Sequence, residues 1–218
     1  MTVGKGFFEK KLVVHDATLG AVTDIILDPT SEAALGVAGL QGAVFLKDDH
    51  SVVSRVTFDV PDRHSSPTRI QFVATKTKGV WEFLDRGGHG WSDASLYGKD
   101  GHLLWAYGGM PGVDDMAAGD LDGDGQPEFV VGFNGAGGLR CLDDTAHEQW
   151  RKMGGNIWHV EIVDMDGDGK PEIIQHRCSR RIRDPRSTRK ISPRDDPRRQ
   201  WTGDSAAVLF DVFPVPLA

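Results

Sequence analysis

The strongest constraint on this chain is an acidic nonapeptide that occurs twice. Asp120-Leu-Asp-Gly-Asp-Gly-Gln-Pro-Glu128 and Asp164-Met-Asp-Gly-Asp-Gly-Lys-Pro-Glu172 agree at seven of nine positions and begin 44 residues apart. Trp105 and Trp150 lie 45 residues apart, each ahead of one copy. A period of roughly 40–50 residues is typical of repeat units made of four β-strands. The spacing therefore predicts a repeat protein built from small β-sheets.

The residues around both copies alternate in hydrophobicity as β-strands do. In residues 157–163, Trp158, Val160 and Ile162 are predicted to share one face, whereas His159 and Glu161 share the other. The three tryptophans that recur with the repeat, at 105, 150 and 158, are expected in the core. No stretch shows the 3.6-residue apolar stripe of an amphipathic helix. We therefore expect an all-β fold with almost no helix.

Fainter copies of the same strand and turn order lie upstream, where the acidic loop is reduced to Asp28-Pro-Thr-Ser-Glu32. We expect a partial β-propeller of about four blade-like units over residues 12–176, with strong repeats in 95–176 and degenerate repeats in 12–94. The last unit is cut short in the sequence pattern. Residues 173–176 are therefore expected to form an open blade edge that is available for self-association.

Both acidic loops offer the oxygen ligands that calcium prefers, since Ca²⁺ binds six to eight oxygens. Carboxylates at loop positions 1, 3, 5 and 9 can converge on one ion if the chain coils tightly, which the paired glycines permit. A backbone carbonyl at position 7 would supply a further oxygen. The predicted ligands of the two Ca²⁺ sites are Asp120, Asp122, Asp124, Gln126 and Glu128, and Asp164, Asp166, Asp168, Lys170 and Glu172.

The EF-hand is the obvious competing interpretation of these loops. An EF-hand requires a glutamate at loop position 12 and a helix on each side. Position 12 is Val131 in the first loop and Gln175 in the second, and the flanking residues are strand-like. The EF-hand interpretation therefore fails.

With these residues in view, the sequence resembles the FG-GAP/VCBS repeat family, the repeats of integrin-alpha-like β-propellers. The segment Leu96–Trp105 is similar to a hairpin that often precedes the loop in bacterial members. The resemblance is strong over 95–176 and weak over 12–94. It implies calcium held between the first two strands of a blade, and an extracellular or cell-envelope setting. It also implies a role in adhesion or in carbohydrate-related processes.

Two classes of function remain open from the sequence. The first is a non-enzymatic, calcium-stabilised binding module with a carbohydrate or protein ligand. The second is the propeller part of a carbohydrate-active enzyme such as a polysaccharide lyase. No His-Glu-x-x-His, Gly-x-Ser-x-Gly or phosphate-loop motif occurs, and His89, His102 and His147 fall among turn residues. Trp81 and Trp91, which do not recur with the repeat, are the candidates for ligand contact.

The charge distribution separates an acidic body from a basic tail. The formal net charge of the chain is -7, but residues 1–176 carry about -12 and residues 177–199 about +7. An acidic body disfavours nucleic acid as its partner. The tail, 177–218, is predicted to be irregular and Arg-rich, and three interpretations stay open. It is a basic arm, a disordered linker, or the product of a shifted reading frame beginning near His176.

Membrane insertion and secretion signals are not expected from this sequence. No run approaches the ~18 apolar residues that span a bilayer. The segment 1–11 has no apolar core of the kind found in a signal peptide. Cys141 and Cys178 have neither zinc-site spacing nor the pattern of a disulfide framework.

Overall fold

The computed structural model describes residues 16–61, 66–88, 93–109, 111–178 and 210–213. These residues form fifteen strands in four antiparallel sheets and contain no helix. The all-β prediction is therefore confirmed for the described residues. Each of the first three sheets contains four strands that follow one another in chain order, and the fourth contains three.

The strands of the first two sheets come from the N-terminal half of the chain. The first sheet contains β1 (Val22–Leu27), β2 (Leu35–Gly39), β3 (Gly42–Leu46) and β4 (Val52–Thr57). The second sheet contains β5 (Ile70–Ala74), β6 (Trp81–Asp85), β7 (Ala94–Tyr97) and β8 (Leu103–Tyr107).

The other two sheets carry the acidic nonapeptides, each of which connects the first strand of its sheet to the second. The third sheet contains β9 (Val113–Gly119), β10 (Glu128–Phe133), β11 (Gly138–Leu142) and β12 (Glu148–Lys152). The fourth sheet contains β13 (Asn156–Val163), β14 (Glu172–Cys178) and β15 (Phe210–Phe213).

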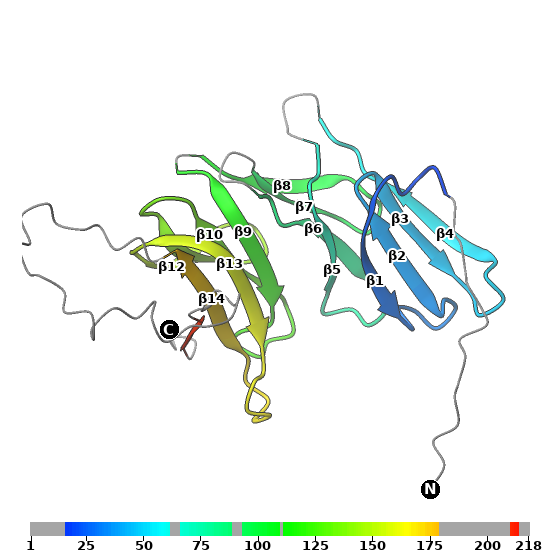
Figure 1. Cartoon of the computed structure of the whole chain (residues 1–218). Helices are drawn as coiled ribbons and strands as arrows, with labels where there is room; N and C mark the ends of the chain where they lie inside the picture. Colours follow the sequence, from blue (N-terminus) through cyan, green and yellow to red (C-terminus); the bar gives the residue numbers. More distant parts are fainter. Residues whose placement is uncertain (1–15, 62–65, 89–92, 110, 179–209, 214–218) are drawn as a thin grey trace, which may run out of the picture.

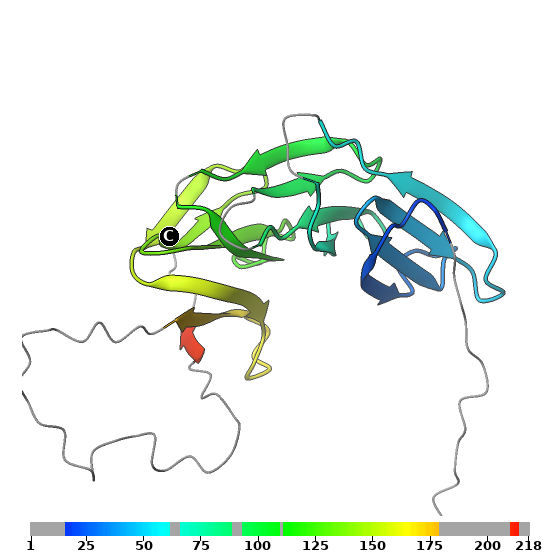
Figure 2. The ribbon, with the colours of Figure 1, turned by 45° about the horizontal axis from the view of Figure 1, so that its top comes forward.

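The sheets lie one after another in chain order along a curved row, with the first and fourth sheets at its opposite ends (Figures 1 and 2). The first strands of successive sheets are neighbours, so that β1 contacts β5, β5 contacts β9 and β9 contacts β13. Each sheet is thus linked to the next through the strand that begins it.

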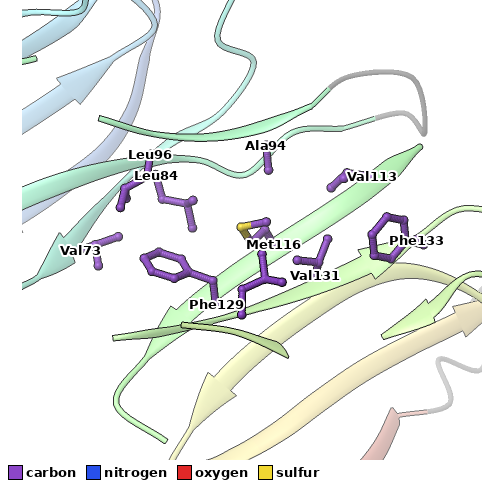
Figure 3. Close-up of a cluster of buried hydrophobic side chains, with 10 residues drawn as sticks. Val73, Leu84, Ala94, Leu96, Val113, Met116, Phe129, Val131 and Phe133 are labelled. Carbon is purple, nitrogen blue, oxygen red and sulfur yellow. The ribbon is translucent and has the colours of Figure 1, made fainter. Parts of the chain in front are cut away.

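Apolar side chains fill the space between successive sheets. One cluster lies between the first and second sheets and includes Phe45, Phe72 and Phe83. Figure 3 shows the next cluster, in which Leu84 and Leu96 of the second sheet face Met116 and Phe129 of the third. A further cluster joins the third sheet to the fourth. Each of these three clusters needs two sheets to close it. A smaller cluster of Leu19, Val37, Val44 and Leu46 belongs to the first sheet alone.

A buried ionic network joins the second, third and fourth sheets at their first strands. Asp115 of β9 is fully buried, and Arg86, just after β6, is almost fully buried. Arg86 donates from Nε and Nη2 to the two carboxylate oxygens of Asp115, each at 3.0 Å. The same guanidinium donates to the Val160 carbonyl at 2.7 Å and to Glu161 at 3.0 Å, both on β13.

Further donors complete the surroundings of the Asp115 carboxylate. The backbone N–H groups of Met116 and Val160 donate to it at 2.9 and 3.0 Å. His159 Nδ1 lies 2.5 Å from Asp115 Oδ2, and Arg69, just before β5, also pairs with this carboxylate. A buried carboxylate is tolerated only when hydrogen bonds replace the water it has lost. The network satisfies that condition.

Trp158 does not occupy the core position predicted for it. A β-bulge between Ile157 and His159 breaks the strict alternation of β13, so that Ile157 and Val160 are both buried while Trp158 is 56% exposed. A bulge adds one residue to a strand and redirects the side chains beside it. Trp105 and Trp150 do pack against core clusters, as predicted.

The open edge predicted at residues 173–176 is also wrong. β15 pairs antiparallel with β14, from Ile173 opposite Phe213 to His176 opposite Phe210. β14 therefore has a partner on both sides and continues to Cys178, past the predicted boundary at 176. The rest of the predicted tail, 179–209 and 214–218, lies outside the described residues.

The Arg86–Asp115 pair provides a test of how the sheets are held together. Replacing Arg86 by Ala leaves Asp115 buried without its main partner, and we expect the free energy of unfolding to fall by about 3–5 kcal/mol. Urea titration followed by fluorescence measures this change. Arg55→Ala is the matched control, because Arg55 pairs with Asp16 at the surface and its loss should cost about 1 kcal/mol or less. Equal losses in the two variants would contradict a structural role for the network.

Candidate metal centres

The first acidic loop connects β9 to β10, the first two strands of the third sheet. Its chain coils tightly because Gly123 and Gly125 take positive φ angles of 81° and 87°. A Cβ atom at Gly123 would meet nothing within 4 Å, so backbone conformation rather than crowding demands glycine there. The sequence thus has glycine at the two loop positions that take a positive φ angle.

Carboxylates hold the first loop from within by accepting backbone N–H groups. The two oxygens of Asp120 accept from Gly123 at 2.7 Å and from Gly125 at 2.9 Å. Asp122 accepts from the N–H of Asp124 at 3.0 Å. Asp124 in turn accepts from Gln126 at 2.7 Å, and Glu128 accepts from Leu121 at 2.6 Å. Each acid therefore has a defined direction, which a flexible acidic turn would lack.

The second loop, between β13 and β14, repeats every one of these hydrogen bonds. Asp164 accepts from Gly167 and Gly169 at 2.7 and 2.9 Å, and Glu172 accepts from Met165 at 2.9 Å. Asp166 and Asp168 accept from the residues two positions ahead, at 3.1 and 2.8 Å. The glycine φ angles are again 79° and 86°. Seven identical residues out of nine therefore produce the same local structure twice.

Three carboxylates converge in each loop. Ligand oxygens of Asp120, Asp122 and Glu128 lie within 4.8 Å of one another, as do those of Asp164, Asp166 and Glu172. Two oxygens that bind the same calcium ion at about 2.3–2.6 Å can lie at most about 5 Å apart. The three oxygens of each group therefore fit one calcium shell. No other group of three or more Asp, Glu, His or Cys side chains converges in this way among the described residues.

The remaining predicted ligands do not belong to the converging carboxylate triplets. Asp124 and Asp168 do not belong to the converging groups, and instead their carboxylates accept from the N–H groups of Gln126 and Lys170. The backbone carbonyls of Gln126 and Lys170 stay a prediction as ligands.

The converging charges affect the acid at the end of the first loop. Partial burial raises the pKa of Glu128 above its usual value, and the nearby charges of Asp122, Asp120 and Asp124 raise it further. The N–H of Leu121 opposes this shift by donating to the carboxylate. A bound cation would remove the repulsion among these acids, since opposite charge favours the ionised form.

Two of the histidines predicted to lie in turns, and one of the tryptophans predicted to contact a ligand, fall within the described residues. His102 and His147 are exposed beside Asp59 and Asp143, as turn histidines were predicted to be, whereas His89 and Trp91 lie outside the described residues. Trp81 has structural contacts, and its role as a ligand contact stays a prediction. Its ring packs against Phe72, and its Nε1 donates to the Pro29 carbonyl at 2.7 Å, which ties the second sheet to the first.

Sequence reasoning did not identify the ionic network around Asp115. Its members Arg69, Arg86 and Glu161 come from segments far apart in the chain, and none belongs to a motif. The one available signal was the pair Asp114-Asp115 inside the apolar strand 113–119. Such a pair is also typical of a turn, so the pattern was ambiguous.

Comparisons with known proteins give no family for this chain. No family model matches it, and no curated protein sequence matches it. A solved structure similar to it is the V. cholerae biofilm matrix protein Bap1, at 17% identity and a TM-score of 0.44, covering 72% of this chain and 24% of that one.

Two structures of BBS1N in complex with ARL6DN are also similar to this chain. The one soaked with lead has 11% identity and a TM-score of 0.49, covering 81% of this chain and 51% of that one. The one soaked with mercury has 12% identity and a TM-score of 0.33, covering 66% and 57%. This chain therefore spans between a quarter and just over half of the chains it matches. At such low identities and TM-scores these similarities carry no inference about function.

The described residues contain no candidate membrane-crossing helix, that is, none long and apolar enough to cross a bilayer.

The positive φ angles give a test of the loop geometry that needs no metal. Gly123→Ala should lower the free energy of unfolding by about 1–2 kcal/mol, because an L residue is strained at φ near 80°. Gly88→Ala is the control, since a Cβ there meets only the Thr68 hydroxyl at 3.8 Å and no positive φ is required. Denaturant titration of both variants in the presence of a chelator measures the difference. No difference between them would refute the coiled conformation of the loop.

Proposed function

We propose that this chain is a calcium-stabilised β-propeller binding module of the FG-GAP/VCBS type, with one Ca²⁺ at each acidic loop. The observation that carries the proposal is the repeated geometry of the loops. Two segments 44 residues apart share their glycine conformations, their internal hydrogen bonds and a converging carboxylate triplet. A chance acidic turn would not be reproduced in such detail at the equivalent point of the next sheet.

The arrangement of the sheets supports the propeller part of the proposal. A propeller blade is a four-stranded antiparallel sheet, and blades pack around an axis that their first strands line. Here the strands of each complete sheet follow in chain order, and β1, β5, β9 and β13 are successive neighbours. The curved row of sheets in Figure 2 fits successive blades around part of such an axis.

The chemistry of the loops supports calcium rather than another metal. All the converging side-chain ligands are carboxylates, and hard oxygen donors favour calcium and magnesium over zinc or copper. The oxygens come from a coiled backbone that can adjust, which suits the larger and more variable calcium shell. When bound, the cation would supply positive charge that offsets the repulsion among the acids, and would thereby tie the first two strands of the sheet together.

A setting outside the cell or in its envelope, with a carbohydrate or protein ligand, belongs to the same proposal. Calcium sites of extracellular modules often have dissociation constants of about 10⁻⁴–10⁻³ M, and such sites fill only where calcium is abundant. Both triplets are largely exposed, with two of their three acids at the surface. Exposed sites of this kind are expected to bind calcium weakly.

Removal of one central acid from each loop tests the calcium assignment. For the unaltered chain, two sites at 100 times their dissociation constant would add about 5 kcal/mol of stability. In a chain of this size that corresponds to roughly 10–20 °C in Tm. We expect Asp122→Ala/Asp166→Ala to abolish most of this calcium-dependent rise, as measured by scanning calorimetry with Ca²⁺ and with a chelator.

The matched control is Asp48→Ala/Asp59→Ala, which removes the same charge from exposed positions outside the acidic loops. Its calcium response should equal that of the unaltered chain. A full calcium response in the Asp122/Asp166 variant would overturn the assignment, and so would an equal loss in the control.

A carbohydrate-active enzyme is the second candidate, and one observation favours it. Arg69 and His159 pair with Asp115, and Glu161 pairs with His159. A general base must reach its substrate. Here both ring nitrogens of His159 are engaged, Nδ1 with Asp115 at 2.5 Å and Nε2 with Glu161 at 3.1 Å. The binding module is therefore the better supported function.

Polysaccharide cleavage separates the two candidates. Incubating the unaltered chain with a panel of polysaccharides, and measuring chain length and new reducing or unsaturated ends, should show no cleavage above a heat-inactivated sample. Cleavage that His159→Ala abolishes, while the Tm stays unchanged, would establish the enzyme instead.

A further inference from the structure

An open hollow of about 520 Å³ lies at one end of the second, third and fourth sheets. Its volume falls within the roughly 300–1,000 Å³ that is usual for ligand sites. The side chains that line it are almost all polar, and one is a large aromatic: Thr68, Arg69, Asp114, Asn134, Asn156 and Trp158.

The hollow lies at the end of the sheets opposite the acidic loops. Thr68 and Arg69 come just before β5, Asp114 is near the start of β9, and Asn156 begins β13. The acidic loops follow the ends of β9 and β13, where Figure 1 shows the second of them projecting from its sheet. The same strands therefore lead from the hollow at their starts to a carboxylate triplet at their ends.

Trp158 faces solvent in the hollow because of the bulge in β13. The bulge keeps Ile157 and Val160 in the core and leaves the indole 56% exposed. The indole is also held in place, since its ring packs edge-on against His176 of β14 with the centroids 6.4 Å apart. Bulges often serve to re-aim a side chain at a functional site. An exposed, oriented indole is a ready surface for an incoming ring.

Two asparagines on the rim are oriented by one backbone N–H group. Gly135 donates to the Oδ1 of Asn134 at 2.6 Å and to the Oδ1 of Asn156 at 3.1 Å. With these oxygens engaged, the Nδ2 groups are the parts of the two side chains suited to donate to a ligand. The hollow thus presents hydrogen-bonding groups whose positions are fixed before any ligand arrives.

Arg69, one of the residues that line the hollow, belongs to the buried network. Arg69 pairs with Asp115, yet its side chain is still 44% exposed. Arg86 donates to the same carboxylate. A guanidinium fixed in this way can donate to a ligand with little further loss of side-chain freedom.

We propose that this hollow binds a saccharide, with one pyranose ring stacked on Trp158 and its hydroxyls bonded to Arg69, Asp114, Asn134 and Asn156. A sugar ring has an apolar face of C–H groups and an edge of hydroxyls that both donate and accept. The hollow offers the matching pair, an indole face beside planar amide, carboxylate and guanidinium groups. The proposal deepens the function proposed above, since it names the ligand class of the binding module.

Other ligand classes fit this hollow less well. An apolar ligand would displace water from these polar side chains without offering hydrogen bonds in return, which is costly. A phosphate or nucleic acid would meet the carboxylate of Asp114 opposite a single exposed guanidinium, on a body of net negative charge. A larger hollow between the first two sheets, beside Trp81 and Phe83, has its aromatic rings engaged in the core.

The test is binding of the full calcium-loaded chain to an array of defined oligosaccharides, followed by titration of each hit in solution. We expect at least one hit whose affinity falls about tenfold or more in Trp158→Ala, as loss of a stacked ring predicts. Trp158→Phe should keep part of the affinity. Asn156→Ala should weaken binding by a smaller factor, as expected for one hydrogen bond.

Leu104→Ala is the matched control, because Leu104 is 51% exposed on β8 and lies outside the hollow. Its affinity should be unchanged. An array with no hit, or hits that Trp158→Ala leaves unchanged, would overturn the saccharide site. So would binding of peptides that depends on Trp158.

Measuring the Tm in Ca²⁺ and in chelator distinguishes a failure of the saccharide site from a failure of the calcium proposal. If Trp158→Ala retains the full calcium response while saccharide binding is lost, the site is established and the fold is intact. If saccharide binding is absent while the calcium response is present, the site is refuted and the calcium proposal stands.

Discussion

The buried carboxylate of Asp115 is the constraint on which much of this structure depends. An ionised group without water is stable only if charged and polar partners surround it, and here they come from three sheets. Arg86, just after β6, bonds to residues of β9 and β13. Arg69, just before β5, pairs with Asp115 of β9. The apolar clusters between the sheets provide the larger part of the stability, but they are not directional. The ionic network adds a defined register between the first strands.

Fixing the first strands also positions the two candidate sites. β9 and β13 run from the hollow beside Trp158 to the acidic loops, so one set of strands supports both. In the proposed function, calcium joins the first and second strands of one sheet at the acidic loops. The ionic network instead joins the first strands of different sheets. Arg69, Asn134 and Asn156, which line the hollow, are already held by an ion pair or a hydrogen bond before any ligand binds. Such preorganisation favours affinity, since less ordering remains to be done.

The sequence predicted local features well and long-range ones poorly. The acidic loops follow from seven shared residues, because their glycines and aspartates determine the coil through contacts a few residues apart. The absence of helix among the described residues follows from the lack of a 3.6-residue period. The position of Trp158 could not be predicted, since one bulged residue shifts the alternation of β13. The pairing of β15 with β14 joins residues separated by more than thirty positions without any repeat, and the partners of Asp115 are similarly scattered.

The central claim is that each acidic loop holds one calcium ion, and calorimetric titration of the unaltered chain tests it most directly. The account predicts two Ca²⁺ ions bound per chain at neutral pH. It also predicts much weaker binding of Mg²⁺, which demands a smaller octahedral shell and gives up its water reluctantly. A titration that shows no calcium binding, a single site, or equal affinity for the two metals would contradict the account.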